Sequence, residues 1–262
     1  MMSKTFPLVV SAVLCLGLLP ASGQFGPPGA GPREALLGGA TGKLFGDNQT
    51  FSARMEMQTS DSDGKTITMP GQLSFDTGKT RFEINVTDMQ GVPMAANDAA
   101  QMKSMGMDQM VTIARPDKNA AYIVYPGMQS FVETELPEAA SPAATNSDYK
   151  VETVEMGKDT VDGHACVKNQ VTVTDKDGNK HVSTVWNATD LKKFPVKIQS
   201  TESGSPVIML FKNVSLAKPN ASLFDVPSAY TKYDDVRTMI QQQVMKRMGG
   251  PGIPRPPGMP GP

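Results

Sequence analysis

His164, Cys166 and His181 are the residues whose types could build a zinc site or a nucleophile with its base. The turn-forming stretch 175–179 predicts a hairpin in which His181 lies opposite a residue near Val173. Cys166 would then lie about seven residues further along the strand, or roughly 23 Å away at about 3.3 Å per residue. This geometry argues against a joint site, and we expect Cys166 to be a small core residue on a strand.

Three loop motifs fall short of the metal and phosphate sites that they resemble. The stretches 61–64 and 175–179 contain the Asp-x-Asp of a calcium loop but lack its third ligand and its distal glutamate. The stretch 38–43 is one residue short of a phosphate loop and is followed by Leu44 instead of serine or threonine. We therefore expect turns at these places, and we expect no bound metal, no cofactor and no enzymatic activity.

Methionine is the strongest anomaly of composition, with 18 in the chain and a dense group between residues 94 and 110. Thioether sulfur is a soft ligand that suits Cu(I), and Met102, Met105, Met107 and Met110 have a spacing suited to such an ion. Methionine is also an adaptable apolar side chain, which suits simple packing or the lining of an apolar ligand site. The sequence leaves packing, an apolar lining and copper binding open.

The N-terminal residues predict that the chain is exported. Lys4 precedes an apolar stretch, Phe6–Leu19, and the small residues Ala21–Gly23 offer a cleavage site. The stretch of about 14 residues is shorter than the roughly 20 needed to span a bilayer, so we expect a signal peptide over 1–23 and a bacterial periplasmic or secreted protein. A net charge of −1 without charged blocks gives no support for binding nucleic acid, and we expect no transmembrane segment in the mature chain.

Alternating apolar residues predict a mainly β fold. In Phe51–Gln58 every second residue is apolar, which places Phe51, Ala53, Met55 and Met57 on one face. Comparable stretches, separated by turn residues, give about eleven strands and hence a large antiparallel sheet or a partly closed barrel. The predicted strands are 51–58, 66–75, 80–86, 111–115, 120–125, 128–135, 149–156, 163–174, 180–187, 195–201 and 206–216.

Two helices and two low-complexity ends complete the predicted organisation. A Met-rich helix is expected within 95–109, and an amphipathic helix over 234–248, where it would cover an exposed part of the sheet. The predicted divisions are a signal peptide (1–23), a Gly/Pro-rich segment (24–45), a β-rich domain (46–233), the amphipathic helix (234–248) and a disordered Gly/Pro-rich tail (249–262).

An ordered series of short motifs resembles the bacterial outer-membrane lipoprotein carrier superfamily (LolA/LolB-like), as an exported branch of it. The motifs are Phe51–Ala53, Gly71–Phe75, Lys79–Phe82, Trp186 with Leu191–Lys197, Phe211–Val214 and Leu223–Pro227. The resemblance implies a half-open antiparallel barrel in which helices plug an apolar cavity for acyl chains. It also implies that an arginine near the start of a strand helps to control ligand release, and Arg81 is the nearest counterpart here.

The leading hypothesis is a non-enzymatic protein that binds a lipid, a lipoprotein acyl chain or another apolar ligand between the concave side of the sheet and its helices. Its predicted ligand-binding residues are Met55, Phe75, Phe82, Met102, Met105, Met110 and Arg81. The main alternative is a structural protein that engages an envelope protein partner through sheet edges and disordered tails. The Met-rich insertion and the Gly/Pro-rich ends depart from the carrier family, so a role in lipoprotein sorting is not carried over.

Replacing Met102, Met105 and Met110 together by leucine distinguishes the interpretations of the methionines. If they pack or line an apolar site, each change conserves volume, costs less than about 1.5 kcal/mol and leaves ligand binding intact. We expect this result, with no tight Cu(I) binding by either protein in titrations against a competing chelator. Stoichiometric Cu(I) binding by the wild type that the triple variant lacks would instead identify a copper site.

Overall fold

The computed structural model describes residues 39–60, 64–136, 149–202 and 205–248. The predicted signal peptide, most of the Gly/Pro-rich segment that follows it and the C-terminal tail lie outside these residues. The helices are α1 (Gly39–Lys43), α2 (Ala96–Met105) and α4 (Val236–Met248). The strands are β1 (Thr50–Ser60), β2 (Thr66–Asp76), β3 (Lys79–Asn85), β4 (Gln109–Arg115), β5 (Ala120–Tyr125), β6 (Ser130–Glu135), β7 (Lys150–Val161), β8 (His164–Thr174), β9 (Lys180–Ala188), β10 (Pro195–Glu202), β11 (Ser205–Ser215) and β12 (Thr231–Tyr233).

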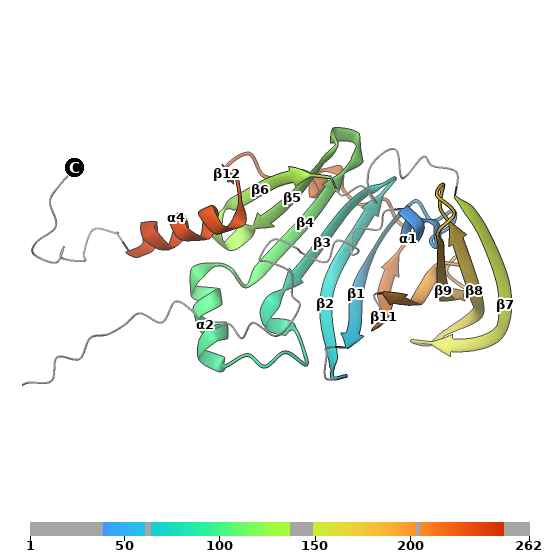
Figure 1. Cartoon of the computed structure of the whole chain (residues 1–262). Helices are drawn as coiled ribbons and strands as arrows, with labels where there is room; N and C mark the ends of the chain where they lie inside the picture. The colour runs from blue at the N-terminus through green and yellow to red at the C-terminus, as the bar shows by residue number, and fades with distance from the viewer. Residues whose placement is uncertain (1–38, 61–63, 137–148, 203–204, 249–262) are drawn as a thin grey trace, which may run out of the picture.

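All twelve strands form one open sheet in the order β12-β6-β5-β4-β3-β2-β1-β11-β10-β9-β8-β7. Neighbouring strands are antiparallel except β12, which runs parallel to β6. Irregular pairing between β1 and β11, between β9 and β10 and within β7 increases the local bend, as bulges do. One half of the sheet therefore curls around α1, while the other half is flatter and carries α2 and α4 at its end (Figure 1).

The prediction of a mainly β fold shaped as a half-open barrel is confirmed. The eleven predicted strands correspond to β1–β11, and the strand that the sequence did not reveal is β12, whose three residues are too few for alternation to be recognised. The predicted helix 95–109 ends earlier, at Met105, because Gly106 adopts a left-handed conformation with φ of 70° and caps it.

The two faces of the sheet are covered by different parts of the chain. We call the face that contacts α1 and α4 the inner face. On it, Ile123, Val132 and Tyr233 pack against Val236 and Met239 of α4. The opposite, outer face of β4 and β5 is covered by the turn η5 (Ala221–Phe224), whose Phe224 is fully buried in a cluster with Val111, Ile113 and Val124.

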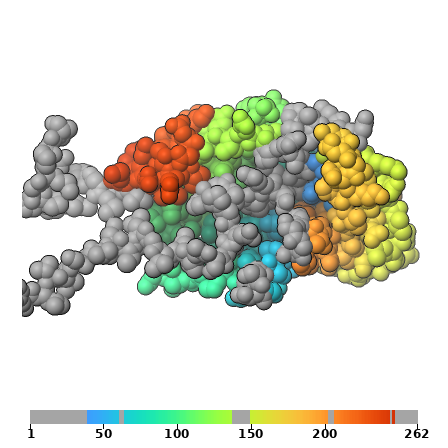
Figure 2. All heavy atoms as spheres, in the orientation of Figure 1, coloured from blue at the N-terminus to red at the C-terminus, as the bar shows by residue number. Residues whose placement is uncertain are grey.

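Helix α4 begins where the sequence predicted a start. The Asp235 carboxylate accepts hydrogen bonds from the Thr238 backbone N–H and from its hydroxyl, both at 2.8 Å, which is an N-cap arrangement. These contacts with Thr238 hold the pKa of Asp235 below its usual range. Figure 2 shows α4, in red, at one end of the molecule and β7 and β8, in yellow, at the other. None of the helices in the described part of the chain is both long and apolar enough to cross a membrane.

None of the residues of helix α2 is buried. At its C-terminal end, however, the backbone makes a close contact that positions it. Gly106, at its end, lies against Gly127, and a Cβ atom on Gly106 would come within 2.5 Å of the Gly127 carbonyl group. Such a distance is impossible without moving one of the two backbones. The seating of α2 therefore depends on the absence of a side chain at both positions.

Replacing Gly106 by alanine should displace α2 and lower the free energy of unfolding by more than the roughly 1–2 kcal/mol that a left-handed alanine costs. Gly178→Ala is the matched control, since Gly178 also has a left-handed φ, of 85°, but nothing lies within 4 Å of its Cβ position. Urea denaturation of both variants measures the difference. Equal losses of stability would mean that the contact with Gly127 does not fix α2.

Candidate functional site

Aromatic packing fills the centre of the curled half of the sheet. The ring of Phe45, just after α1, stacks on Phe51 of β1 at 5.0 Å between centroids and meets the edges of Phe194 and Phe211 at 5.6 Å and 5.5 Å. All four side chains are fully buried. Because these rings occupy the centre, the space left for a ligand lies beside them.

A cavity of about 160 Å³ lies between α1 and the inner face of the strands β8–β11. Its apolar lining comes from Ala40 and Leu44 beside α1 and from Val173, Ile198 and Met209 on the sheet. Val182 also borders it, and its polar lining comes from Thr41, Lys180, His181, Ser183, Ser200 and Thr201. The cavity thus has an apolar floor and a polar rim.

The floor of the cavity continues across the sheet as a row of methionines. Ile198 pairs directly with Met209, Met209 with Met57, and Met57 with Met69, so the row crosses β10, β11, β1 and β2. Directly opposite side chains in antiparallel strands have Cβ atoms about 4.5–5.5 Å apart and therefore touch. Met57 is half-buried, whereas Met69 and Met209 are buried. We call Met209, Met57 and Met69 the methionine row.

Three of the predicted ligand-binding residues lie together in the main core. Met55, Phe75 and Phe82 belong to the same buried cluster on the inner face. The ring of Phe82 lies over Gly71 of the neighbouring strand, where a Cβ atom would meet it at 2.4 Å. These side chains are therefore part of the core that stabilises the inner face. That they contact a ligand stays a prediction.

The three methionines predicted on or near the inserted helix are separated by the structure. Met110 lies at the start of β4 and packs against both the main core and the cluster beneath α4. Met102 and Met105 are half-buried on α2, which contributes no side chain to a buried cluster of the described residues. Their predicted role in ligand binding remains a prediction, as does the role of Met110.

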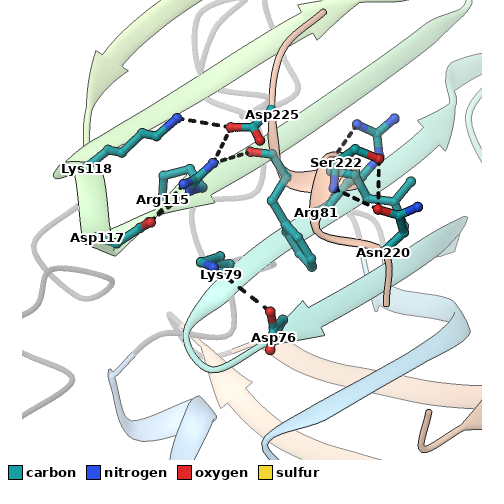
Figure 3. Close-up of polar contacts among 11 residues, drawn as sticks. Asp76, Lys79, Arg81, Arg115, Asp117, Lys118, Asn220, Ser222 and Asp225 are labelled. Carbon is teal, nitrogen blue, oxygen red and sulfur yellow. Dashed lines mark hydrogen bonds and ion pairs between the residues drawn. The ribbon is translucent and has the colours of Figure 1, made fainter. Parts of the chain in front are cut away.

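Arg81 lies on the opposite face from the other predicted site residues. Its neighbour Phe82 points to the inner face, and successive side chains of a strand alternate between faces. The Arg81 guanidinium donates a hydrogen bond at 3.0 Å to the Leu223 carbonyl oxygen of η5 (Figure 3). It donates another at 2.6 Å to the Glu83 carboxylate. In the structure, Arg81 therefore helps to hold η5 on the outer face. Its influence on ligand release is still a prediction.

A polar clamp beside Arg81 was not recognised from the sequence. The buried Arg115 guanidinium donates to both Asp117 oxygens at 2.8 Å, to the Phe224 carbonyl oxygen at 3.1 Å and to Asp225, which Lys118 also contacts at 3.0 Å (Figure 3). Arg115 holds the pKa of Asp117 below its usual range, and Lys118 together with Arg115 does the same for Asp225. The clamp fixes η5 on the outer face. The contact between Arg115 and Asp225 could not be predicted from the sequence, because the two residues are 110 positions apart. An arginine before a Pro-Asp turn does not indicate which distant residue it will contact.

A second hollow, of about 560 Å³, lies at the β7–β8 hairpin and opens to solvent. It borders Cys166, which is buried on β8 as predicted. Burial raises the pKa of the Cys166 thiol, and the negative charges of Asp190 and Asp159 raise it further. A thiol kept protonated is a poor nucleophile.

Val173 pairs with His181, as the hairpin argument predicted, so His181 is far along the strand from Cys166. The smaller cavity is the better candidate because it is less open to solvent and its floor of Ile198 and Met209 belongs to the main core on the inner face.

The described residues contain no group of three or more His, Cys, Asp or Glu side chains placed to hold a metal ion. The arrangement at the cavity offers hydroxyl groups and one imidazole around an apolar floor. Such groups can bind and orient a ligand through contact and hydrogen bonding.

Residues 51–194 match the sequence profile of a family described as "Domain of unknown function (DUF4412)". The chain belongs to this family. The matched DUF4412 region begins in β1 and ends just before β10, so it contains most of the sheet and the Met-rich insertion. A search of curated proteins gave no match.

Solved structures with a similar fold include members of the superfamily that the sequence motifs resemble. A LolA superfamily protein, NE2245 from Nitrosomonas europaea, is 8% identical, with 74% of this chain and 96% of that chain covered and a TM-score of 0.38. LprF from Mycobacterium bovis is 12% identical, with 73% and 98% covered and a TM-score of 0.36. A putative outer membrane lipoprotein-sorting protein domain from Vibrio parahaemolyticus is 10% identical, with 74% and 93% covered and a TM-score of 0.34. At these identities and TM-scores the likeness to the LolA-like superfamily stays a resemblance, and ligand and function rest on this chain's own residues.

The clamp predicts a distinct dependence of stability on pH. Because the pKa values of Asp117 and Asp225 are lower in the folded state than in the unfolded chain, their ion pairs stabilise the fold above pH about 4. This contribution is lost as the pH falls through the lowered values. Arg115→Gln should therefore be less stable than the wild type at pH 7 and should lose less stability between pH 7 and pH 3, as measured by urea midpoints.

The control for this experiment is Arg54→Gln, because the Arg54 side chain is 56% exposed and its Nε atom lies as far as 3.9 Å from the Glu56 carboxylate. Such an exposed pair contributes little to stability. Its pH profile should follow that of the wild type. If Arg115→Gln and Arg54→Gln gave the same profile, the clamp would not carry the acid sensitivity of the fold.

Proposed function

We propose that this exported chain is a non-enzymatic binding protein that holds an apolar chain, such as the acyl chain of a lipid, on the inner face of the sheet. The observation that carries the proposal is the cavity beside α1, whose apolar floor of Val173, Ile198 and Met209 runs on into the methionine row. The ligand would begin in the cavity and continue over Met57 towards Met69.

The size of the cavity indicates which part of a ligand it takes. A volume of about 160 Å³ is close to the roughly 150 Å³ of an apolar cavity that accommodates benzene. It therefore has room for a portion of about six carbon atoms, and the rest of a longer chain needs a second surface. The methionine row supplies that surface, because it begins at Met209, which borders the cavity.

Methionine is suited to this task for a physical reason. Its three rotatable bonds and polarisable sulfur let it fit ligands of irregular shape. Each methylene that leaves water for such a surface contributes about 0.8 kcal/mol, so a chain of modest length binds without any polar contact. The half-buried Met57 stands in the middle of the row, where a ligand would cover it.

On the outer face of β1, β8, β9, β10 and β11, several described side chains are charged or aromatic and contact one another. There, Lys212 forms an ion pair with Glu56 at 2.9 Å, and the indole of Trp186 is flanked by Lys168 and Lys197. These side chains are engaged with each other. The inner face is therefore the better surface for an apolar ligand.

Met57→Glu should weaken binding of an uncharged fluorescent probe, diphenylhexatriene, by about tenfold or more, because the ligand would have to desolvate a carboxylate. Gln58→Glu is the matched control, since Gln58 is the next residue of β1, is equally half-buried and points to the outer face. Fluorescence titration measures both. Native mass spectrometry of the purified wild type should also show bound lipid, on a chain that begins at Gln24.

A wild-type protein that carries no lipid and does not bind the probe would contradict the proposed function. Equal weakening by Met57→Glu and Gln58→Glu would place the ligand elsewhere than on the methionine row. Circular dichroism at the titration temperature verifies that both variants remain folded.

A further inference from the structure

The methionine row contains one side chain that is partly open to solvent and two that are buried. Met57 belongs to β1, which lies between β2 and β11 in the sheet (Figure 1), and it is half-buried. Its direct partners on these neighbouring strands, Met69 and Met209, are only 8% and 5% exposed. Within the row, Met57 is therefore the side chain that a small solute in water can reach.

The thioether sulfur of methionine has a chemistry that other apolar side chains lack. A hydroperoxide transfers one oxygen atom to it and gives methionine sulfoxide. The sulfur lone pair attacks a peroxide oxygen, and the O–O bond breaks. The departing hydroxide takes up the proton of the transferred hydroxyl and leaves as water. Sulfur thereby loses two electrons, which the peroxide gains, and the apolar side chain becomes a polar one.

The surroundings of Met57 make a sulfoxide at this position unfavourable for binding of an apolar ligand. The cross-strand neighbours Met69 and Met209 are thioethers, which donate no hydrogen bond. Water can satisfy the sulfoxide oxygen in the ligand-free protein, but an apolar chain laid over it would displace that water. Covering a polar group without a replacement hydrogen bond costs free energy. Oxidation of Met57 should therefore weaken the binding of a ligand that crosses the row.

We propose that Met57 is a modification site, where oxidation by a hydroperoxide switches off ligand binding on the inner face and where a bound ligand protects the sulfur. This inference rests on the proposed function and specifies how the same site is regulated. The two effects belong together, because the ligand covers the side chain that the oxidant must reach. Methionine sulfoxide reductases convert the sulfoxide back to the thioether, so the change is reversible.

The test treats the chain that begins at Gln24 with hydrogen peroxide, removes the oxidant and titrates diphenylhexatriene. Peptide mass spectrometry should find oxygen on Met57, and the affinity of the wild type should fall by about tenfold or more, as expected for a covered polar group without a partner. Met57→Leu should keep whatever affinity it has before the treatment, because leucine is not oxidised. Methionine sulfoxide reductases should restore the wild type. Dodecanol, a saturated ligand, should slow the oxidation of Met57 when it is present during the treatment.

Met245→Leu is the matched control, because Met245 is 73% exposed and lies on α4, outside the methionine row. Peroxide should weaken binding by this variant as much as by the wild type, and dodecanol should not slow the oxidation of Met245. Three results would contradict the inference while the proposed function stood: an equal loss of affinity in Met57→Leu, an oxidised Met57 without loss of affinity, or an unmodified Met57 beside an oxidised Met245. Failure of the untreated wild type to bind the probe would instead overturn the proposed function itself.

Discussion

The packing of Phe45 against Phe51, Phe194 and Phe211 is the interaction on which the rest of the inner face depends. These rings come from both sides of the β1–β11 pairing and from the turn before β10, so they join strands that are far apart in sequence. Because Phe45 directly follows α1, the same contact fixes a helix of only five residues inside the curled half of the sheet. A helix of that length has little stability of its own, and its position is set by packing.

An open sheet has two faces, and a separate segment of the chain covers the outer face of β4 and β5 in this one. The segment between β11 and β12 crosses β3, β4 and β5, where Phe224 fills an apolar pocket. Arg81 and Arg115 hold the carbonyl oxygens of Leu223 and Phe224, so two cations fix the backbone of one turn. The carboxylates of Asp117 and Asp225 then offset the cost of burying Arg115. The outer face of β4 and β5 is therefore held by an apolar cluster together with charged contacts, whereas the inner face is held by apolar contacts.

Local sequence patterns were sufficient to predict most of the sheet and its class. Alternation over 51–58 placed Met55 and Met57 on one face, and the structure has both there, because a two-residue period leaves a strand no other way to bury them. Strand β12 was not predicted, because its three residues are too few for alternation to be recognised. The end of α2 at Gly106 was not predicted either, because it depends on a left-handed backbone conformation. The Arg115 clamp was not predicted because an ion pair between distant residues depends on topology.

The candidate site shows the same division between local and global information. Alternation within their own strands was enough to place Met55, Phe75 and Phe82 on the inner face, where they belong to the core. The cavity is lined by other residues, from α1 and β8–β11, which no local motif joins. Met209, Met57 and Met69 become neighbours only through the registers of β1 with β2 and with β11.

A slip of one residue in either pairing would turn the side chains of one strand to the other face and divide the methionine row. The bulge that shifts the β1–β11 register lies between Ser52 and Arg54, on the side of the aromatic rings, and the pairs from Arg54 to Gln58 follow it without interruption. The aromatic packing that seats α1 and the methionine row therefore depend on the same pairing of β1 with β11. The enclosed cavity and the extended apolar surface are consequences of one arrangement of strands, which is why a ligand that uses both would be sensitive to the geometry of the whole curled half of the sheet.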